Sequence, residues 1–336
     1  MIAESQSGGR MMRALVYDRY GLPDVLRIEE VEKPIPKENE VLIAVHAASL
    51  NSWDLDLLTG KPLVNRLGAM RKPRYRILGA DVAGRVLAVG TEVNRLRPGD
   101  EVFGDLSGCG WGGFAEYVCA SEAALTLKPE GVSFEQAAAI PQAAVLALQG
   151  LRTQGGLAKG HRVLINGAAG GVGTFAIQYI KLQGAEVTGV DAAEKLDLLR
   201  SVGADHVADY RTEDFTAGGP QYDLILDVVG TRSVFEMKRA LKPGGTYVMI
   251  GGTSNRIIQA ALTGPLLAWF SRKKVKVLLH KVSHDDQLIW KSLVEKGKVV
   301  PVIDRQFAFD DAVEAFHYYQ EGRVKGKIIV SMTEAR

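Results

Sequence analysis

The stretch VLINGAAGGVGTFAIQ, residues 163–178, decides the fold of this chain. Apolar residues and Asn166 end a predicted strand, glycines follow at 167, 170, 171 and 173, and a helical pattern then begins. Glycines allow a tight turn and leave room for a pyrophosphate, and a helix N-terminus directs free N–H groups toward it. The alternative is an ordinary glycine-rich turn. We expect the turn to bind a dinucleotide, and the predicted contacts are Ala168, Ala169, Gly170, Gly171, Val172 and Gly173.

The segments around this turn alternate between strands and helices. The stretches AEVTGVD (185–191), YDLILDVVG (222–230) and GGTYVMIGG (244–252) are almost continuously apolar, and amphipathic helical patterns separate them. This alternation indicates a parallel sheet with helices on both faces. We therefore predict an α/β, doubly wound nucleotide-binding domain over residues 137–283.

The two ends of the chain have a different pattern. Residues 12–136 contain short strand patterns with a turn signal about every ten residues, which is typical of a small β-barrel. Residues 284–336 are again rich in strand patterns, and we expect them to pack on the first domain. Residues 1–11 are dominated by Ser, Gln and Gly and are predicted to be a disordered leader. No run of about 18 apolar residues occurs, so no membrane span is expected.

The composition excludes several classes of protein. The chain has 41 Lys and Arg against 39 Asp and Glu, a net charge of +2, which gives no reason to expect nucleic acid as the main partner. Cys109 and Cys119 are too few for a disulfide framework or a four-cysteine zinc site. Because so few cysteines fit a reducing compartment, we expect a cytoplasmic protein.

Asp191 bears on which dinucleotide binds. It ends a predicted strand 21 residues after Gly170, where an acidic residue accepts hydrogen bonds from the adenosine ribose. A carboxylate there also repels a 2′-phosphate. The nearby cation is Lys195, and Lys195 or Tyr210 could still accommodate a phosphate. The cofactor is therefore expected to be NAD(H) or NADP(H), with a slight preference for NAD(H).

Four motifs together carry a family resemblance. They are GxDxxGxV at 79–86, GGFAEYV at 112–118, GAAGGVG at 167–173 and GKIIV at 326–330. The chain resembles the medium-chain dehydrogenase/reductase superfamily over nearly its whole length, and within it the zinc-free quinone oxidoreductase branch with the zeta-crystallin-like enzymes. The resemblance implies a chaperonin-10-like β-barrel domain, a Rossmann domain and a cofactor cleft between them. It also implies a homodimer formed through the Rossmann edge strand near GGTYVMIGG.

The zinc ligands of the superfamily are missing. Its alcohol dehydrogenases bind catalytic zinc through an early Cys, a GHE segment and a later Cys or Glu. The first two of these positions can be compared with this chain residue by residue. The early position is Asn51, and the GHE segment is Gly79-Ala80-Asp81. Zinc needs three or four N, S or O ligands, so we expect no metal.

Without a metal, the substrate itself must accept hydride readily. Quinones and α,β-unsaturated carbonyls do so, because the charge moves onto an oxygen that hydrogen bonds stabilise. We expect a zinc-independent NAD(P)H-dependent oxidoreductase acting on such small molecules. An alcohol or aldehyde oxidoreductase, and a non-catalytic cofactor-binding relative with a structural or RNA-binding role, are the alternatives.

The candidate catalytic residues lie in the segment Asn51-Ser52-Trp53-Asp54, which matches an NPxD segment of the related enzymes. By resemblance Asn51 orients the nicotinamide or the substrate oxygen, and Asp54 fixes the loop. Turn capping is the alternative for both. The helix that usually begins PxAGLTA has Leu146 in place of the threonine, which removes a hydroxyl expected near the nicotinamide.

The remaining expectations concern the rim of the cleft. Val229 and Gly251 end two later strands, where open α/β sheets bind ligands, and Tyr210 is placed by resemblance against the adenine. Lys327 either reaches the cleft or lies on the surface, and Trp111 borders the substrate pocket or belongs to the core. The basic loop 61–76 is either a solvated loop or a lid.

Overall fold

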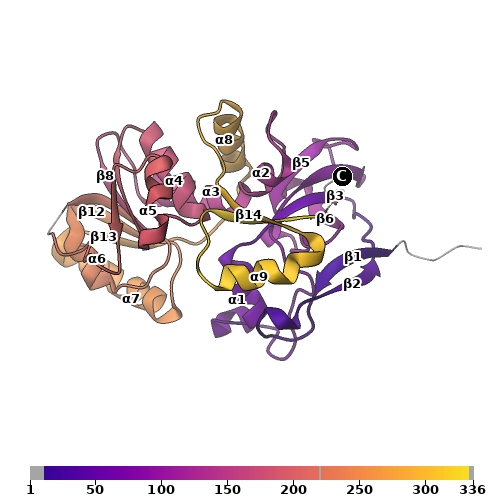
Figure 1. Ribbon diagram of the computed structural model, residues 1–336, viewed down its shortest axis with the longest axis horizontal. Helices are drawn as coiled ribbons and strands as arrows, with labels where there is room; N and C mark the ends of the chain where they lie inside the picture. Colours follow the sequence, from indigo (N-terminus) through magenta and orange to yellow (C-terminus); the bar gives the residue numbers. More distant parts are fainter. Residues whose placement is uncertain (1–10, 219–220, 333–336) are drawn as a thin grey trace, which may run out of the picture.

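The computed structural model describes residues 11–218 and 221–332, and these form two lobes joined side by side (Figure 1). The predicted leader lies outside the described residues except for Met11, which begins strand β1. No helix of the described residues is long and apolar enough to cross a membrane.

The first lobe is a β-barrel-like lobe built from both ends of the chain. Its described strands form a sheet in the order β14-β15-β3-β4-β5-β7, with β6 paired to β3. The bounds are β3 Glu40–Ser49, β4 Asp81–Val89, β5 Glu101–Asp105, β6 Tyr117–Ser121, β7 Leu125–Leu127, β14 Ile303–Ala308 and β15 Lys327–Ser331. A hairpin of β1 (Met11–Val16) and β2 (Arg27–Glu32), and the helices α1 (Ser52–Thr59) and α9 (Ala312–Gln320), complete the lobe. β15 pairs antiparallel with β3, so strands from the C-terminal segment extend the sheet of the first lobe.

The second lobe confirms the predicted doubly wound parallel sheet. Its six described strands have the order β10-β9-β8-β11-β12-β13 and run parallel. They are β8 Arg162–Asn166, β9 Glu186–Asp191, β10 His206–Asp209, β11 Tyr222–Asp227, β12 Leu241–Met249 and β13 Lys274–Val277. The helices between them are α4 Gly171–Leu182, α5 Leu196–Ser201, α6 Val234–Ala240 and α7 Ser254–Ser271. The strand order reverses between β8 and β11, and ligands of such sheets bind at this point.

One expectation about the sheet is wrong. The stretch GGTYVMIGG falls largely in β12, which pairs with β11 on one side and with β13 on the other. The chain returns through α7 and adds β13 outside β12, so β13 is the edge strand of the described sheet. An apolar sequence did not reveal the edge, because interior and edge strands of a covered sheet share that pattern.

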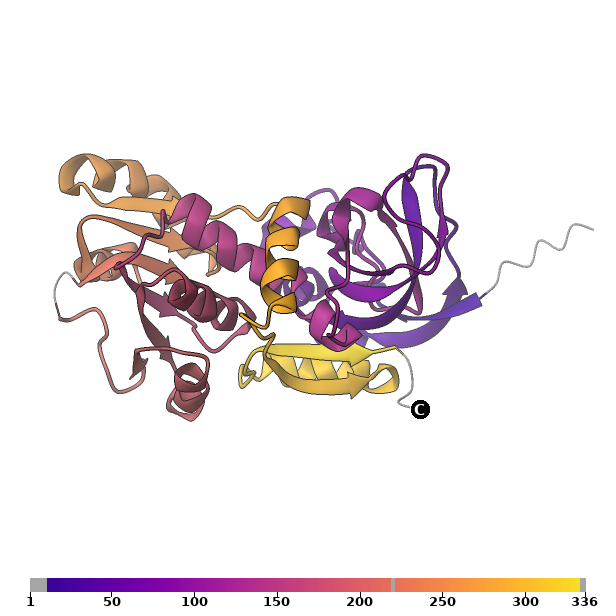
Figure 2. The ribbon, with the colours of Figure 1, turned by 90° about the horizontal axis from the view of Figure 1, so that it is seen from above.

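Three helices connect the lobes: α2 (Phe134–Ala138), α3 (Pro141–Leu148) and α8 (His284–Glu295). Both views place α8 between the lobes (Figures 1 and 2). The Trp290 ring of α8 is fully buried, with its centroid 5.3 Å from that of Phe175 and 5.6 Å from that of Tyr179, both on α4. The same apolar cluster includes Ala47 and Phe103 of the barrel strands, so one core runs from one lobe into the other.

Candidate active site

The glycine turn at the end of β8 has the geometry that phosphate binding requires. Gly167 has a φ of +82°, which favours glycine, and Gly170 caps α4 without any side-chain hydrogen bond. A Cβ on Gly173 would lie 2.2 Å from the Ala168 carbonyl oxygen, so glycine is needed for the helix to pack on the turn. The first-turn N–H groups of α4 therefore have no side-chain cap where a phosphate would approach.

A cavity of about 740 Å³ lies between the lobes, in front of this turn. Its wall on the second lobe comes from the glycine turn and from the carboxyl ends of β8, β9 and β11. Its wall on the other side comes from the start of α1, the start of α3 and the segment that leads into β15. The predicted site residues that line the cavity, on either side, are Asn51, Gly170, Gly171, Val172, Asp191, Lys195, Tyr210 and Val229. The same cavity is lined by Gly170 and Gly171 of the turn, expected to bind the pyrophosphate, and by Asn51, expected to orient the nicotinamide or the substrate oxygen.

Asp191 lies at one end of the cavity and holds the turn in shape. Its Oδ2 accepts a hydrogen bond of 2.9 Å from the Ala169 N–H, and its Oδ1 accepts one of 2.9 Å from the Ala192 N–H. The Lys195 ammonium lies 3.6 Å from Oδ1 and donates to the Gly322 carbonyl at 2.9 Å. Asp191 is therefore a partly neutralised carboxylate beside the turn.

Two arginines at this end were missed by sequence reasoning. Arg211 lies with its guanidinium 5.6 Å from the centre of the Tyr210 ring and forms an ion pair with Glu194, and Arg323 also lines the cavity. The sequence argument considered cations close to Asp191 along the chain. Arg211 arrives from the end of the neighbouring strand β10, and Arg323 from the segment between α9 and β15, so their proximity depends on the fold.

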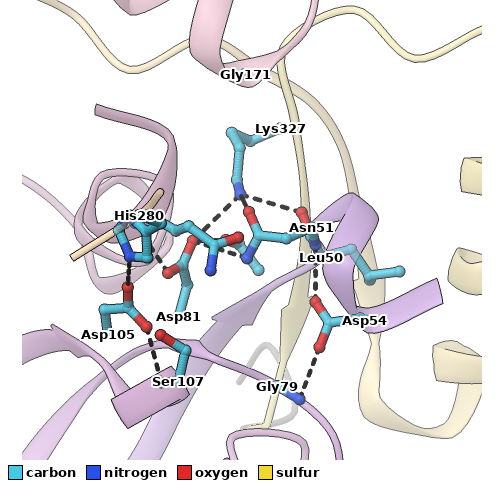
Figure 3. A network of polar contacts seen from close by, with 12 residues as sticks. Leu50, Asn51, Asp54, Gly79, Asp81, Asp105, Ser107, Gly171, His280 and Lys327 are labelled. Carbon is cyan, nitrogen blue, oxygen red and sulfur yellow. Dashed lines mark hydrogen bonds and ion pairs between the residues drawn. The ribbon is translucent and has the colours of Figure 1, made fainter. Parts of the chain in front are cut away.

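At the other end of the cavity, Lys327 is buried and fully hydrogen-bonded. Its ammonium donates to the Leu50 carbonyl at 3.0 Å, to Asn51 Oδ1 at 2.6 Å and to Asp81 Oδ2 at 3.2 Å (Figure 3). Lys327 is 3% exposed and Asp81 is 0% exposed. An ammonium has three N–H donors, so all of them are used here. Lys327 therefore reaches the cleft, and its role is to hold the loop that carries Asn51.

The Asp81 carboxylate accepts hydrogen bonds from four segments of the chain. Its Oδ2 accepts from Ser49 Oγ and Asn51 Nδ2, each at 3.1 Å, and its Oδ1 accepts from the Gln142 N–H at 3.0 Å. Burial raises the pKa of Asp81, and the nearby Lys327 ammonium opposes this by lowering it. The carboxylate thus joins β3, α1, α3 and β15 at one point.

Asp54 lies behind the loop and not on the cavity wall. Its Oδ2 accepts from the Asn51 N–H at 2.8 Å, which completes a capping box at the start of α1, and its Oδ1 accepts from the Gly79 N–H at 2.9 Å. Burial raises the pKa of Asp54 to about 7. This position suits a residue that fixes the loop, whereas Asn51 itself faces the cavity.

Several of the predicted cofactor-binding residues do not line the cavity but pack behind its wall. Ala168 and Ala169 belong to the turn and Gly173 to the start of α4, and these three residues do not line the cavity. Gly251 is also outside the lining, and a Cβ there would lie 2.3 Å from the Val228 carbonyl oxygen. Their small size permits the close packing that places the lining residues.

Trp111 and the basic loop lie away from the cavity. Trp111 is buried in the barrel core, with its ring edge-to-face against Trp53 at 5.3 Å. Among the side chains of 61–76 that the structure describes, none lines the cavity. Arg66 donates to the carbonyls of residues 59 and 60, and Arg76 pairs with Asp18, so part of the loop's charge is used within the first lobe.

Gln142 is a cavity residue that sequence reasoning passed over. It is 4% exposed, it lines the cavity, and its Nε2 is buried without a hydrogen-bond partner. The sequence offered a signal, because a polar residue directly after Pro141 interrupts an otherwise apolar helix start.

Comparison with known proteins agrees with this architecture. Residues 37–130 match the alcohol dehydrogenase GroES-like domain, and residues 202–330 match the family described as zinc-binding dehydrogenase. The chain is 36% identical, over 95% of its length and 79% of the relative's, to a 2-methylene-furan-3-one reductase of Solanum lycopersicum. It is 35% identical, over 95% of its length and 79% of the relative's, to an NADPH-dependent alkenal/one oxidoreductase of Arabidopsis thaliana.

A solved structure extends the likeness to three dimensions. The quinone oxidoreductase from Coxiella burnetii superposes with a TM-score of 0.87 at 31% identity, and the match covers 96% of this chain and all of that one. A GroES-like lobe, a Rossmann lobe and a glycine turn facing the cavity between them define a two-domain, nicotinamide-dependent oxidoreductase. The chain belongs to the medium-chain dehydrogenase/reductase superfamily, in its quinone-oxidoreductase-like branch.

Proposed function

We propose that this protein is a zinc-independent NAD(P)H-dependent reductase of quinones or activated α,β-unsaturated carbonyls. The observation that carries the proposal is the Lys327 ammonium, bound to Asn51 and Asp81 at the positions where the resemblance expects zinc-ligand segments. A divalent cation there would meet a buried ammonium of like charge. The described residues also contain no group of three or more His, Cys, Asp or Glu that could hold a metal ion. These residues do not fit a zinc ion.

They do fit a nicotinamide dinucleotide. The uncapped start of α4 would bind the pyrophosphate, Asp191 would accept from the adenosine ribose, and Tyr210 would pack on the adenine. Asn51 and Leu146, on the opposite part of the wall, would then hold the nicotinamide end. When bound in reduced form, the cofactor supplies hydride.

The chain's own residues then supply orientation and a dry surface. Leu50 and Ala143 are 1% and 3% exposed and line the cavity near Asn51, so they exclude water from the reacting end. Asn51 is held by Lys327 and Asp81 and cannot turn freely. A fixed, water-poor environment favours an acceptor that carries its own electron sink, which quinones and enones do.

The relatives support this substrate class, since one is a 2-methylene-furan-3-one reductase and another an NADPH-dependent alkenal/one oxidoreductase. The test measures NADH and NADPH oxidation with para-benzoquinone, methyl vinyl ketone and an aldehyde, with and without a zinc chelator. We expect turnover of the quinone or the enone that the chelator leaves unchanged. Chelator-sensitive activity confined to the aldehyde, or no turnover with any acceptor, would overturn the proposal.

The proposal includes a preference for NAD(H) over NADP(H). It is supported by the Asp191 carboxylate at the ribose end, where a 2′-phosphate would meet a negative charge. Lys195 and Arg211 lie at the same end and moderate this repulsion, so the preference is slight and NADP(H) is also used.

The proposal further includes a homodimer, with β13 as the pairing strand. β13 is the outermost described strand on its side of the parallel sheet, and its residues are exposed or half-buried. An edge strand offers unpaired N–H and C=O groups to a second copy. Sedimentation equilibrium should give twice the mass of the chain, and a monomer across micromolar concentrations would contradict this assembly.

A further inference from the structure

The unexplained polar group of the active site is the carboxamide of Gln142. Its backbone N–H is bonded to Asp81, which fixes the start of α3, but its side-chain Nε2 is buried and has no partner. A buried N–H without an acceptor is costly to the folded state. Gln142 lines the cavity although its Nε2 atom is itself buried, so a ligand in the cavity can supply the missing acceptor once the amide turns toward it.

Lys327 and Asn51, two other polar side chains at this end, are already engaged. The three N–H groups of Lys327 all donate hydrogen bonds to protein oxygens. The Asn51 carboxamide accepts from Lys327 through Oδ1 and donates to Asp81 through Nδ2, so it is held at both ends. The Gln142 amide differs, because its last torsion angle is soft and rotation can turn the N–H toward the cavity without moving the backbone.

The position of Gln142 on α3 also matters. Residues four apart lie on one face of a helix, and Gln142 and Leu146 both line the cavity. The resemblance expects a hydroxyl at position 146, where this chain has an aliphatic side chain. Gln142 therefore places a hydrogen-bonding group on the same helix face, one turn earlier.

We propose that the Gln142 carboxamide donates a hydrogen bond to the carbonyl oxygen of the acceptor and stabilises the negative charge that develops there. This inference rests on the proposed function. In enone reduction, hydride from the nicotinamide forms a C–H bond at the β-carbon, and the C=C π electrons shift so that charge collects on the carbonyl oxygen as an enolate. A proton from water then completes the saturated ketone, and NAD(P)H is oxidised to NAD(P)⁺. Gln142 acts on the oxygen during the hydride step.

The test compares wild type with Gln142→Leu in three measurements. Single-turnover hydride transfer to the enone or quinone should fall about 100-fold, the effect of losing one oxyanion donor. NADH affinity, measured by fluorescence titration, should stay within about twofold, because the donor serves the acceptor and not the cofactor. The melting temperature of the cofactor-free protein should stay equal or rise, since the substitution removes an unpaired buried amide.

Gln149→Leu is the matched control. Gln149 is also a buried glutamine on the continuation of α3, but its amide is satisfied by the Lys281 carbonyl and by Asp286, and it does not line the cavity. This variant should lower the melting temperature and leave the hydride-transfer rate within about twofold of wild type. The two glutamines should therefore give opposite patterns of stability and rate.

A second variant tests whether a hydroxyl on the same helix face can restore the rate that Gln142→Leu loses. Adding Leu146→Thr to Gln142→Leu returns a hydroxyl to the same helix face and should recover at least about tenfold of the lost rate. Wild-type turnover with an unchanged rate in Gln142→Leu would overturn the role of Gln142 alone. A lost NADH affinity would instead assign the amide to the nicotinamide. No turnover by wild type would overturn the proposed function together with this inference.

Discussion

At the residue scale, the role of each polar group in the cavity follows from how many of its hydrogen bonds the protein already uses. Lys327 has none left, Asn51 is held at both ends, and Gln142 has an unpartnered Nε2. Fully bonded groups give rigidity, whereas a buried unpartnered group raises the free energy of the folded state until a ligand pairs with it. Lys327 and Asn51 thus shape the pocket, whereas the amide of Gln142 can still form a hydrogen bond with a ligand.

A first prediction concerns Asp191. Asp191→Ser removes the negative charge beside the ribose, so the ratio of kcat/KM for NADPH to that for NADH should rise about tenfold, or about 1.4 kcal/mol. Steady-state kinetics with both cofactors measures this ratio. Because Asp191 also accepts from the Ala169 and Ala192 N–H groups, the melting temperature of the variant is the control for a distorted turn. A wild type that strongly prefers NADPH would refute the assignment.

A second prediction uses the titration of Asp54. Burial raises its pKa to about 7, against about 3.9 in an unfolded chain. Between these values the folded state holds a proton that the unfolded state has released. The contribution of Asp54 to the free energy of unfolding therefore falls as the pH rises from about 4 to about 7, by up to about 1.4 kcal/mol per unit.

Urea unfolding of wild type and of Asp54→Asn between pH 5 and pH 8 measures this effect. Asn does not titrate, so the stability of wild type minus that of the variant should decline up to about pH 7 and then level off. A difference that grows with pH would show instead that the ionised carboxylate is the form stabilised by the N–H groups of Asn51 and Gly79.

At the element scale, the start of α4 combines two demands that different glycines meet. Gly173 lets the helix approach the turn, because a Cβ there would strike the Ala168 carbonyl oxygen at 2.2 Å. Gly170 has an ordinary φ of −78°, and a Cβ there would meet nothing nearer than the Gly167 oxygen at 3.9 Å. Gly173 therefore serves packing, and Gly170 keeps the cavity side of the turn open.

Alanine at these two positions should therefore give different phenotypes. Gly173→Ala should lower the free energy of unfolding by about 1–3 kcal/mol through overpacking. Gly170→Ala should change stability by less than about 0.5 kcal/mol but weaken cofactor binding at least tenfold, because its methyl group occupies the space of a phosphate. Urea unfolding and NADH titration separate the two effects. Equal losses of stability would refute the distinction.

At the scale of the whole molecule, one apolar cluster is shared by both lobes. Trp290 of α8 packs on α4, and the same cluster reaches Phe103 of the barrel. A polar contact adds to this connection, since His280 Nε2 lies 2.6 Å from Asp105 Oδ2 (Figure 3). The cavity wall comes from both lobes, so their relative position decides the geometry of the site.

We therefore expect the two lobes to unfold together. Thermal unfolding followed by circular dichroism and by tryptophan fluorescence should give coincident transitions. Trp290→Ala should lower the free energy of unfolding by about 3–5 kcal/mol, because it opens a cavity in the shared core. Two separated transitions in wild type would show that the lobes are independent.

Much of the fold was predictable from the sequence because its signals are local. The glycine turn, the apolar strands and the helical spacing predicted the doubly wound sheet. The short strand patterns with regular turn signals predicted the barrel lobe, and the family resemblance implied the same lobe. The edge strand was placed wrongly, since the sequence pattern of β12 does not reveal that β13 is added outside it. Arg211 and Arg323 were missed for a similar reason, because they reach the cavity that Asp191 lines from separate segments of the chain.

The sequence by itself determined the class of this protein, because turn geometry and strand–helix alternation depend on residues close together along the chain. Only the tertiary structure decided the chemistry of the cavity. Lys327 and Asn51 are far apart in sequence yet lie 2.6 Å apart through their side-chain atoms, and Gln142 is left with an unpartnered amide only in the folded chain. Whether a buried polar group is satisfied depends on all the segments that surround it, and no local pattern records that.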